Sequence, residues 1–193
     1  MNHYIKSISN YPIKKDKPWL ILGKGPTFSK VWKLIRDKNY YTIALNHVGS
    51  VFDADICHVI DIAGLPEKAN NLFIPLHPHV DFAPIKRSIL ESNTLDKFEN
   101  TYTYNLSTYK GQTNKFYPLI RARYFSAEAV FNILSMLRIT TINSLGIDGG
   151  TEYAEEFFEM GLKPLTNGRD TFDDGIKELT NLCLLKGLTW NRL

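Results

Sequence analysis

Residues 19–27 read WLILGKGPT, and this short stretch decides the fold that we expect. Four apolar residues run directly into a turn that contains two glycines. A short strand without polar residues is typical of a parallel sheet that is buried on both faces. A glycine-rich turn between such a strand and a helix often meets a phosphate group. The stretch therefore raises the question of which ligand this turn holds.

Apolar strands and helical patterns alternate along the rest of the chain. A helix is expected after the turn, because Phe28, Val31, Trp32 and Ile35 recur at helical spacing. The expected strands are 19–22, 41–45, 56–60, 72–76 and 140–147, and the further expected helices are 85–98, 126–138, 153–160 and 171–186. This alternation predicts an α/β fold, a single Rossmann-like domain with a mainly parallel sheet and helices on both faces. We expect the domain to cover residues 18–193, after an irregular N-terminal arm over residues 1–17.

Bulk properties narrow the class of protein. A length of 193 residues favours one domain, and a net charge of +3 suits an anionic ligand. Cys57 and Cys183 stand in apolar contexts, so we expect buried free thiols and a reducing, cytoplasmic location. No apolar run approaches the roughly 20 residues that span a bilayer, and the N-terminus shows no secretory signal.

Polar residues follow several of the predicted strands at the point where each strand ends. These residues are Gly23–Thr27, Asn46, Asp61, His77, His79 and Asp148. In open α/β sheets, ligands bind beyond the carboxyl ends of the strands. The sequence therefore predicts one binding site at this edge of the sheet.

The glycine turn matches neither common phosphate-binding fingerprint. It lacks the third glycine of the dinucleotide motif, and Asn46 ends the second strand where an acidic residue would bind a ribose. It also lacks the Lys-Ser/Thr pair of the P-loop. We expect Gly23 and Gly25 to adopt positive φ and to approach a ligand closely, with Pro26 in the first helical turn and free N–H groups from Thr27 onward.

Several motifs, in the same order, resemble two known families. The segments LILGKGPT, IALNHV and CHVIDI are followed by YFSAEAVFNILSMLRITTINSLGIDGG. Together they resemble the bacterial sialyltransferases that use CMP-sugars and the archaeal-type 6-hydroxymethyl-dihydropterin pyrophosphokinase group. The resemblance covers roughly residues 18–82 and 120–155.

The resemblance to the sialyltransferases implies which residues contact a nucleotide. They are Gly23, Gly25, Pro26, Thr27, Asn46 and Ser126, and we add the neighbouring Lys24 and Asp61. The sequence also departs from that family. Lys24 replaces its usual asparagine, no histidine follows His79, and only Tyr153 lies near its phosphate-binding tyrosine pair. We therefore expect a nucleotide-sugar donor without assigning CMP-sialic acid.

Two residues are candidates for the general base that deprotonates an acceptor hydroxyl. They are His79, whose ordinary pKa lies near neutrality, and Asp148. In the alternative reading as a pyrophosphokinase, Asp61 and Asp148 would hold Mg²⁺ on the nucleotide phosphates. The leading reading as a transferase requires no metal or other cofactor.

The segment 100–127 contains no acidic residue, and cations alternate in it with aromatic side chains. Its cations are Lys110, Lys115, Arg121 and Arg123. One interpretation is a lid whose aromatic residues pack in the core. The other is a surface for phosphates or for an anionic acceptor, to which Lys14, Lys15 and Lys17 would add charge and which would admit nucleic acid.

The sequence thus predicts a glycosyltransferase that moves a sugar from a nucleotide-sugar donor to a hydroxyl acceptor. The acceptor is a glycan, a small molecule or a nucleic acid. A Mg²⁺-dependent pterin-type pyrophosphokinase and a non-catalytic nucleotide-binding module remain the alternatives.

Overall fold

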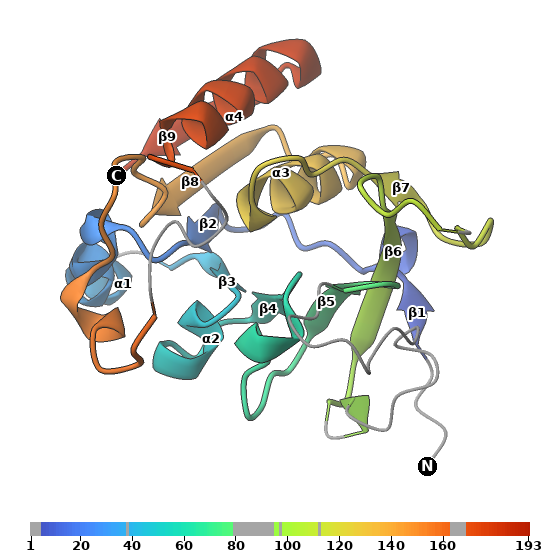
Figure 1. Cartoon of the computed structure of the whole chain (residues 1–193), viewed down its shortest axis with the longest axis horizontal. Coiled ribbons are helices and arrows are strands. Elements are labelled where there is room, and N and C mark those ends of the chain that lie inside the picture. Colours follow the sequence, from blue (N-terminus) through green and yellow to red (C-terminus); the bar gives the residue numbers. More distant parts are fainter. Residues whose placement is uncertain (1–4, 38, 79–94, 97, 112, 163–168) are drawn as a thin grey trace.

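The computed structural model of the chain describes residues 5–37, 39–78, 95–96, 98–111, 113–162 and 169–193. Its centre is one sheet between two layers of helices (Figure 1). Among the described residues every strand pair is parallel, and the strand order is β1-β6-β5-β4-β3-β2-β8-β9, with β7 beside β6. The predicted α/β, Rossmann-like architecture is confirmed.

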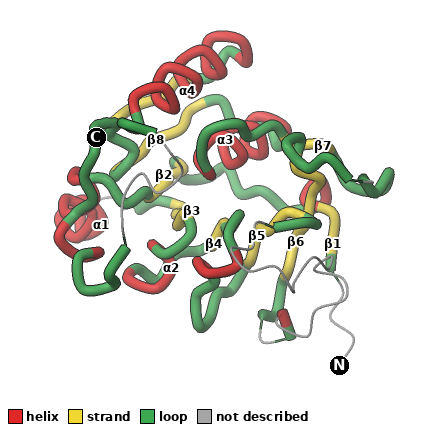
Figure 2. The backbone as a smooth tube through the Cα atoms, viewed as in Figure 1, coloured by secondary structure: helices red, strands yellow, loops and turns green. Residues whose placement is uncertain are grey.

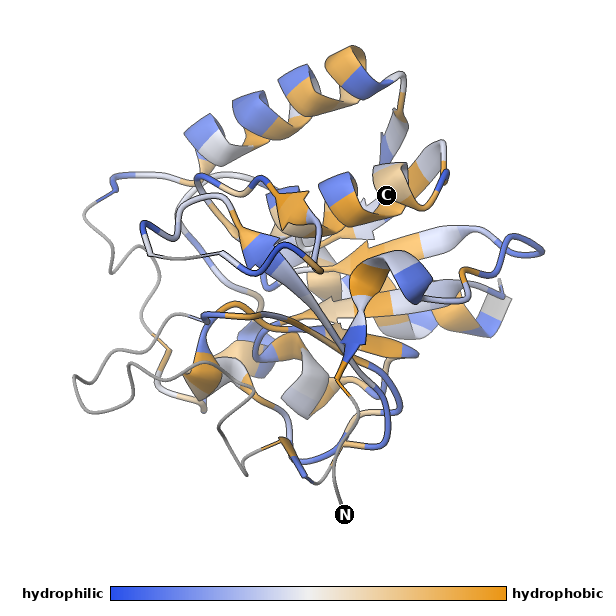
Figure 3. Cartoon of the chain, turned by 90° about the vertical axis from the view of Figure 1, so that its right-hand side faces the viewer, coloured by the Kyte–Doolittle hydropathy of each residue, from blue (hydrophilic) through white to orange (hydrophobic). Residues whose placement is uncertain are grey.

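The central strands are short and have no exposed face. Every side chain of β2, β3, β4, β5 and β6 is buried. Apolar residues accordingly concentrate on the strands between the helix layers (Figure 3). The strands are β1 (Lys6–Ser7), β2 (Trp19–Leu22), β3 (Tyr41–Leu45), β4 (Ile56–His58), β5 (Leu72–Pro75), β6 (Thr101–Leu106), β7 (Leu119–Ile120), β8 (Thr141–Leu145) and β9 (Thr189–Arg192).

The helices lie on both faces because the chain reverses its direction across the sheet. From β2 it proceeds strand by strand to β6, then returns to β8 on the other side of β2. Right-handed crossovers therefore place α3 and α4 opposite the earlier helices, and separate core clusters lie on the two faces. The helices are α1 (Val31–Asp37), α2 (Val48–Val51), α3 (Ser126–Met136) and α4 (Asp173–Lys186), with 3₁₀ turns η1 (Ile8–Asn10), η2 (Pro26–Lys30), η3 (Ile62–Gly64) and η6 (Glu155–Phe157).

The acid-free segment contains a strand that the sequence analysis did not predict. β6 is buried at all six positions, and its Tyr102 and Tyr104 pack in the core beneath α3. Alternating threonine and tyrosine are common in strands, so this composition carried the signal. The aromatic residues in this half of the segment belong to the core, as the first interpretation stated.

Other expected elements are shorter or lie elsewhere. The helix after the glycine turn begins as the 3₁₀ turn η2, and the helix expected over 153–160 is reduced to η6. Residues 6–10 of the N-terminal arm form β1 and η1, because β1 pairs with β6 and Ile8 is buried. Most of the helix predicted over 85–98 lies outside the described residues. The C-terminal strand β9, which was not predicted, pairs with β8 at the sheet edge.

Loops gather at the carboxyl edge of the sheet. The described residues of the connection from β6 to β7 and the segment directly after β8 have no regular structure (Figure 2). Cys57 and Cys183 are buried free thiols, as predicted. Within the part of the chain that the structure describes, no helix has the length and apolar character needed to cross a membrane.

Candidate functional site

A cavity of about 780 Å³ lies at the carboxyl edge of the sheet. It lies beyond the ends of the neighbouring strands β2 and β8, from which the chain continues to β3 on one side and to β9 on the other, and this is the topological switch point of the fold. Residues after β2, β3, β4 and β8 line it, together with the turn before α3 and residues before α4. The predicted site residues that line it are Gly23, Lys24, Gly25, Asn46, Asp61, Arg123, Ser126, Asp148 and Tyr153.

The glycine turn packs against the loop after β8. The N–H of Gly25 donates to the carbonyl of Gly146 at 2.9 Å, and that of Gly23 to the carbonyl of Leu145 at 2.8 Å. A Cβ on Gly23 would lie 2.3 Å from the Gly146 carbonyl oxygen, and one on Gly25 would lie 2.7 Å from a carboxylate oxygen of Asp148. These glycines are required because two backbone segments approach each other closely.

The expectation of positive φ in this turn is wrong. Among the described glycines, φ is positive at Gly146, Gly149, Gly150, Gly161 and Gly187, and Gly25 has φ −66°. The left-handed conformation occurs instead in the neighbouring segment after β8, where Gly146 has φ +69°. The chain turns away from β8 at this residue, and the Gly23 carbonyl leaves no space there for a side chain.

We call the close contact between the segments after β2 and β8, at Gly23 and Gly146, the glycine crossing. Asp148 and Thr27 connect its two segments. The Asp148 carboxylate accepts from the Thr27 backbone N–H at 2.7 Å and from its hydroxyl at 2.6 Å. The same hydroxyl accepts from the backbone N–H of Gly146 at 2.8 Å. The N–H of Thr27, expected to be free, is thus already bonded, and neither Thr27 nor Pro26 lines the cavity.

Asn46 joins three elements at the floor of the cavity. Its side-chain amide donates to the Ser126 hydroxyl oxygen at 2.8 Å, and its side-chain carbonyl accepts from the backbone N–H of Ile60 at 3.0 Å. Its φ of 49° lies in the left-handed region that asparagine tolerates better than most residues. Ser126 uses its oxygen as acceptor for Asn46, so its hydroxyl proton remains for a ligand.

Lys24 and Tyr153 form a second group of residues that line the cavity. The Nζ atom of Lys24 lies 4.4 Å from the Tyr153 ring centroid, and that ring stacks on Phe172 at 5.9 Å. Burial lowers the pKa of Lys24, while the charge of Asp61 acts in the opposite direction. Burial, aided by Asp61, raises the pKa of Tyr153. A partly desolvated cation beside two rings suits a ligand that combines phosphate with a planar group.

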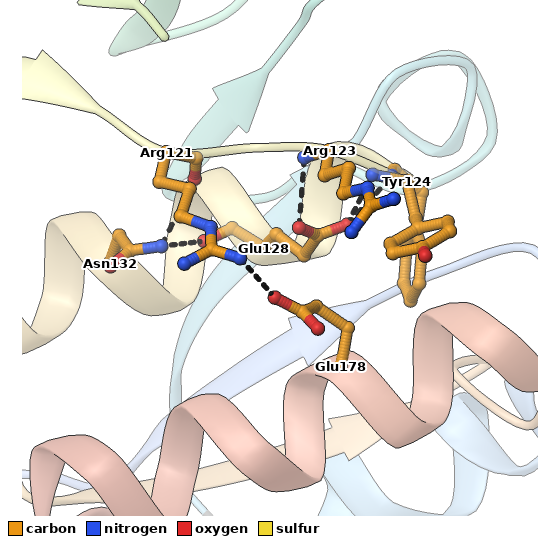
Figure 4. Close-up of polar contacts among 7 residues, drawn as sticks. Arg121, Arg123, Tyr124, Glu128, Asn132 and Glu178 are labelled. Atoms are coloured by element: carbon orange, nitrogen blue, oxygen red, sulfur yellow. Dashed lines mark hydrogen bonds and ion pairs between the residues drawn. The ribbon is translucent and has the colours of Figure 1, made fainter. Parts of the chain in front are cut away.

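Other predicted residues lie away from the cavity. Lys110 and Lys115 are exposed on the loop after β6, and neither lines the cavity. Arg121 is exposed and pairs with Glu178 of α4, with 2.7 Å between Nη2 and Oε1 (Figure 4). His77 stacks on Tyr109 at 4.0 Å between ring centroids, and His79 lies outside the described residues.

The structure adds residues that sequence reasoning missed. His47, Tyr124, Phe125, Glu152, Arg169 and Phe172 also line the cavity. His47 directly follows Asn46 at a strand end, so the strand-end rule had the means to include it. Burial and the positive charge of Lys24 lower the pKa of His47, while a hydrogen bond to the backbone of Ala63 acts in the opposite direction. Arg169 does not follow a strand that the sequence predicts, and the sequence gives no signal for it.

Comparisons with protein-family profiles, with curated proteins and with solved structures gave no match. A search of the described residues for three or more clustered histidine, cysteine, aspartate or glutamate side chains also found none. The function is therefore argued from the cavity itself.

Proposed function

We propose that the chain is a glycosyltransferase that binds a nucleotide-sugar donor in the cavity at the switch point. One observation carries the proposal. Gly23, Gly25, Asn46 and Ser126, to which the resemblance assigns nucleotide contacts, come from three separate parts of the sequence and line one cavity. Its volume of about 780 Å³ falls within the usual range for small-molecule sites.

In this proposal the residues of the predicted nucleotide site divide into two roles. The glycines, Thr27 and Asn46 shape the cavity, because their polar groups are engaged with other parts of the chain. Ser126 contacts the donor through its hydroxyl group, at the first turn of an 11-residue helix. The N-terminus of such a helix also favours a negative charge.

Cations at the cavity would stabilise the leaving phosphate. Lys24 and Arg123 both line the cavity. As the bond from the sugar to the donor phosphate breaks, negative charge accumulates on the phosphate oxygens. Positive groups held in place stabilise that charge more in the transition state than in the ground state.

Transfer also requires a base for the proton of the acceptor hydroxyl. Asp148 lines the cavity, and although each carboxylate oxygen accepts one bond from Thr27, each retains a second lone pair. The acceptor oxygen would form the new bond to the sugar as the base takes its proton. His79 is the other candidate, on sequence grounds.

The acceptor that fits best is a small molecule or a glycan. The two halves of the predicted polyanion surface lie at opposite edges of the sheet. Lys14 and Lys17 lie over the ring of Tyr41, which begins β3, whereas the cavity is at the carboxyl edge. The buried free thiols are consistent with activity in the reducing cytoplasm.

A binding screen tests the proposal. Thermal shift and calorimetry with nucleotides and nucleotide sugars should identify a ligand whose binding is weakened about tenfold by Ser126→Ala, since one hydrogen bond to a charged group is lost. Ser135→Ala, on the same helix but away from the cavity, is the matched control. Mass spectrometry should then detect transfer or donor hydrolysis.

Three results would redirect the assignment. Preference for ATP together with loss of activity in EDTA would favour the pyrophosphokinase. Nucleotide binding without turnover over a broad donor panel would favour a binding module. For the base, Asp148→Asn and His79→Ala are compared: the true base should lose about 10²–10⁴-fold in kcat with donor affinity kept.

A further inference from the structure

The turn in front of α3 forms one side of the cavity, and we call residues 122–126 the wall. A buried glutamate holds its backbone from within (Figure 4). The Glu128 carboxylate accepts from the backbone N–H groups of Arg123 at 2.8 Å, Tyr124 at 2.5 Å and Phe125 at 3.0 Å. Glu128 is only 1% exposed, so these bonds replace the water that its carboxylate has lost.

This arrangement exceeds what a helix start requires. A glutamate at this position commonly caps the single N–H of the residue before the helix. Glu128 instead binds three consecutive N–H groups, two of which precede that residue. A carboxylate bonded in this way fixes the path of the chain before the helix, in addition to stabilising the helix.

Arg169 holds the same turn from the other side. Its guanidinium donates to the backbone carbonyl of Tyr124 at 2.8 Å and to that of Arg123 at 3.3 Å, and it lies 4.6 Å from the Tyr124 ring centroid. The Phe125 carbonyl accepts from the backbone N–H of Glu128 at 3.1 Å. Every backbone N–H and C=O from Arg123 to Phe125 is therefore bonded.

The Arg123 side chain, in contrast to this backbone, is not hydrogen-bonded to any described residue. The Arg123 guanidinium lies over the Tyr124 ring, 5.0 Å from its centroid, and has no hydrogen-bond acceptor among the described residues. Arg121, two residues earlier, is paired with Glu178. A guanidinium offers five N–H donors, so Arg123 lines the cavity with its donors unused.

We infer that Glu128 and Arg169 are positioning residues, which hold the wall so that Arg123 binds an anionic group of the ligand. The inference rests on the proposed function, under which that group is a phosphoryl group of the donor. A guanidinium on a fixed backbone loses less conformational freedom when it binds, so the two positioning residues contribute to affinity without touching the ligand.

The test uses calorimetric titration of the full chain with UDP, GDP and inorganic pyrophosphate. Glu128→Gln keeps the side-chain volume but replaces one acceptor oxygen with an N–H₂ donor, which cannot accept from the backbone N–H groups. Arg169→Lys removes the guanidinium that donates to two backbone carbonyls at once. Each should weaken binding about tenfold, as should Arg123→Gln. Glu128→Gln combined with Arg123→Gln should be no weaker than Arg123→Gln alone, because both act through one guanidinium. Arg121→Gln and Glu178→Gln are matched controls and should remain within about twofold.

Hydrogen exchange of the amides of residues 123–125 supplies a readout independent of ligand. Protection should fall in Glu128→Gln and stay unchanged in Glu178→Gln. Lost protection with unchanged affinity, or additive effects in the double variant, would overturn the positioning role. If Glu128→Gln does not fold, Arg169→Lys decides the same question at a partly exposed site.

The inference and the proposed function can fail separately. If the unmodified chain binds pyrophosphate but no nucleotide, the proposed function fails while the role of Arg123 stands. If it binds none of the three probes, the ligand role of Arg123 is refuted. If nucleotide binds and Arg123→Gln leaves its affinity unchanged, the inference alone is refuted.

Discussion

The glycine crossing between β2 and β8 and the wall before α3 both line one cavity, yet they use their polar groups in opposite ways. At the crossing, the N–H groups of Gly23, Gly25 and Thr27 all bond to the neighbouring loop. At the wall, the backbone is equally satisfied, but the Arg123 guanidinium has no hydrogen-bond acceptor in the part of the chain that the structure describes. The backbone of a motif that resembles a phosphate loop here serves packing, and the groups available to a ligand are side chains such as Lys24 and Arg123.

The largest effect should come from breaking the crossing. Gly146→Ala places a Cβ 2.1 Å from the Gly23 carbonyl oxygen at a residue with φ +69°. We expect a loss of about 4 kcal/mol or more in the free energy of unfolding, because backbone strain and a backbone clash combine. Gly150→Ala is the matched control. It has φ +65° with no atom within 4 Å of its Cβ, and should cost only about 1 kcal/mol. Urea denaturation measures both, and equal losses would contradict a tight crossing.

A smaller effect should follow when the bridge across the crossing is removed. Thr27→Val deletes the hydroxyl that donates to Asp148 and accepts from Gly146. Two partly buried groups lose their partners, so we expect a loss of about 2–3 kcal/mol in unfolding free energy. Thr27→Ser keeps the hydroxyl and should lose less than 1 kcal/mol. A Thr27→Val protein as stable as the unmodified chain would show that the bridge contributes nothing.

The buried His58 should make the free energy of unfolding depend on pH. His58 is fully buried and shares a hydrogen bond of 2.8 Å with the Tyr104 hydroxyl, and its backbone carbonyl accepts from Asn46. Burial lowers the pKa of His58 to about 3, against about 6.5 for an exposed histidine. The unfolded chain therefore binds more protons between these values, and stability falls as pH falls through that window. Between pH 7.5 and pH 5 the loss should be about 2 kcal/mol.

His58→Gln removes this titration while it keeps a partner for Tyr104. Chemical denaturation at several pH values above 5, where most carboxylates remain charged, compares it with the unmodified chain. A pH profile as steep in His58→Gln as in the unmodified chain would assign the acid sensitivity to other groups.

The smallest effect is expected at Arg121, which is paired, in contrast to Arg123. Arg121 and Glu178 form a pair whose side chains are 61% and 23% exposed. Such surface pairs contribute about 1 kcal/mol or less. Arg121→Ala should therefore shift the melting temperature by only a few degrees and should lose that effect in high salt. A loss above 2 kcal/mol would show that Arg121 supports the wall.

Several features of the fold were predictable because they depend on local pattern. β2 and β3 match the predicted bounds, since an unbroken apolar run between turns has few other arrangements. α4 ends at Gly187 in the left-handed conformation, as a glycine after a helical pattern predicts. β6 was missed because its tyrosines stand in a segment whose cations and aromatic residues resembled a ligand surface, and β9 because an exposed edge strand has no apolar pattern.

By itself, the sequence determined the class of fold and the edge of the sheet at which a cavity opens. Short apolar runs that alternate with helical patterns predict a parallel sheet, and parallel strands bring their carboxyl ends to one edge. Only the tertiary structure decided what each residue there does. Gly23 and Gly146 lie 123 positions apart in the sequence, and each must be glycine because the fold brings their backbones into contact. Arg121 is paired and Arg123 is not, because Glu178 of the distant helix α4 lies beside Arg121 among the described residues. Hydrogen-bond partners are set by distance in space, which spacing along the chain does not encode.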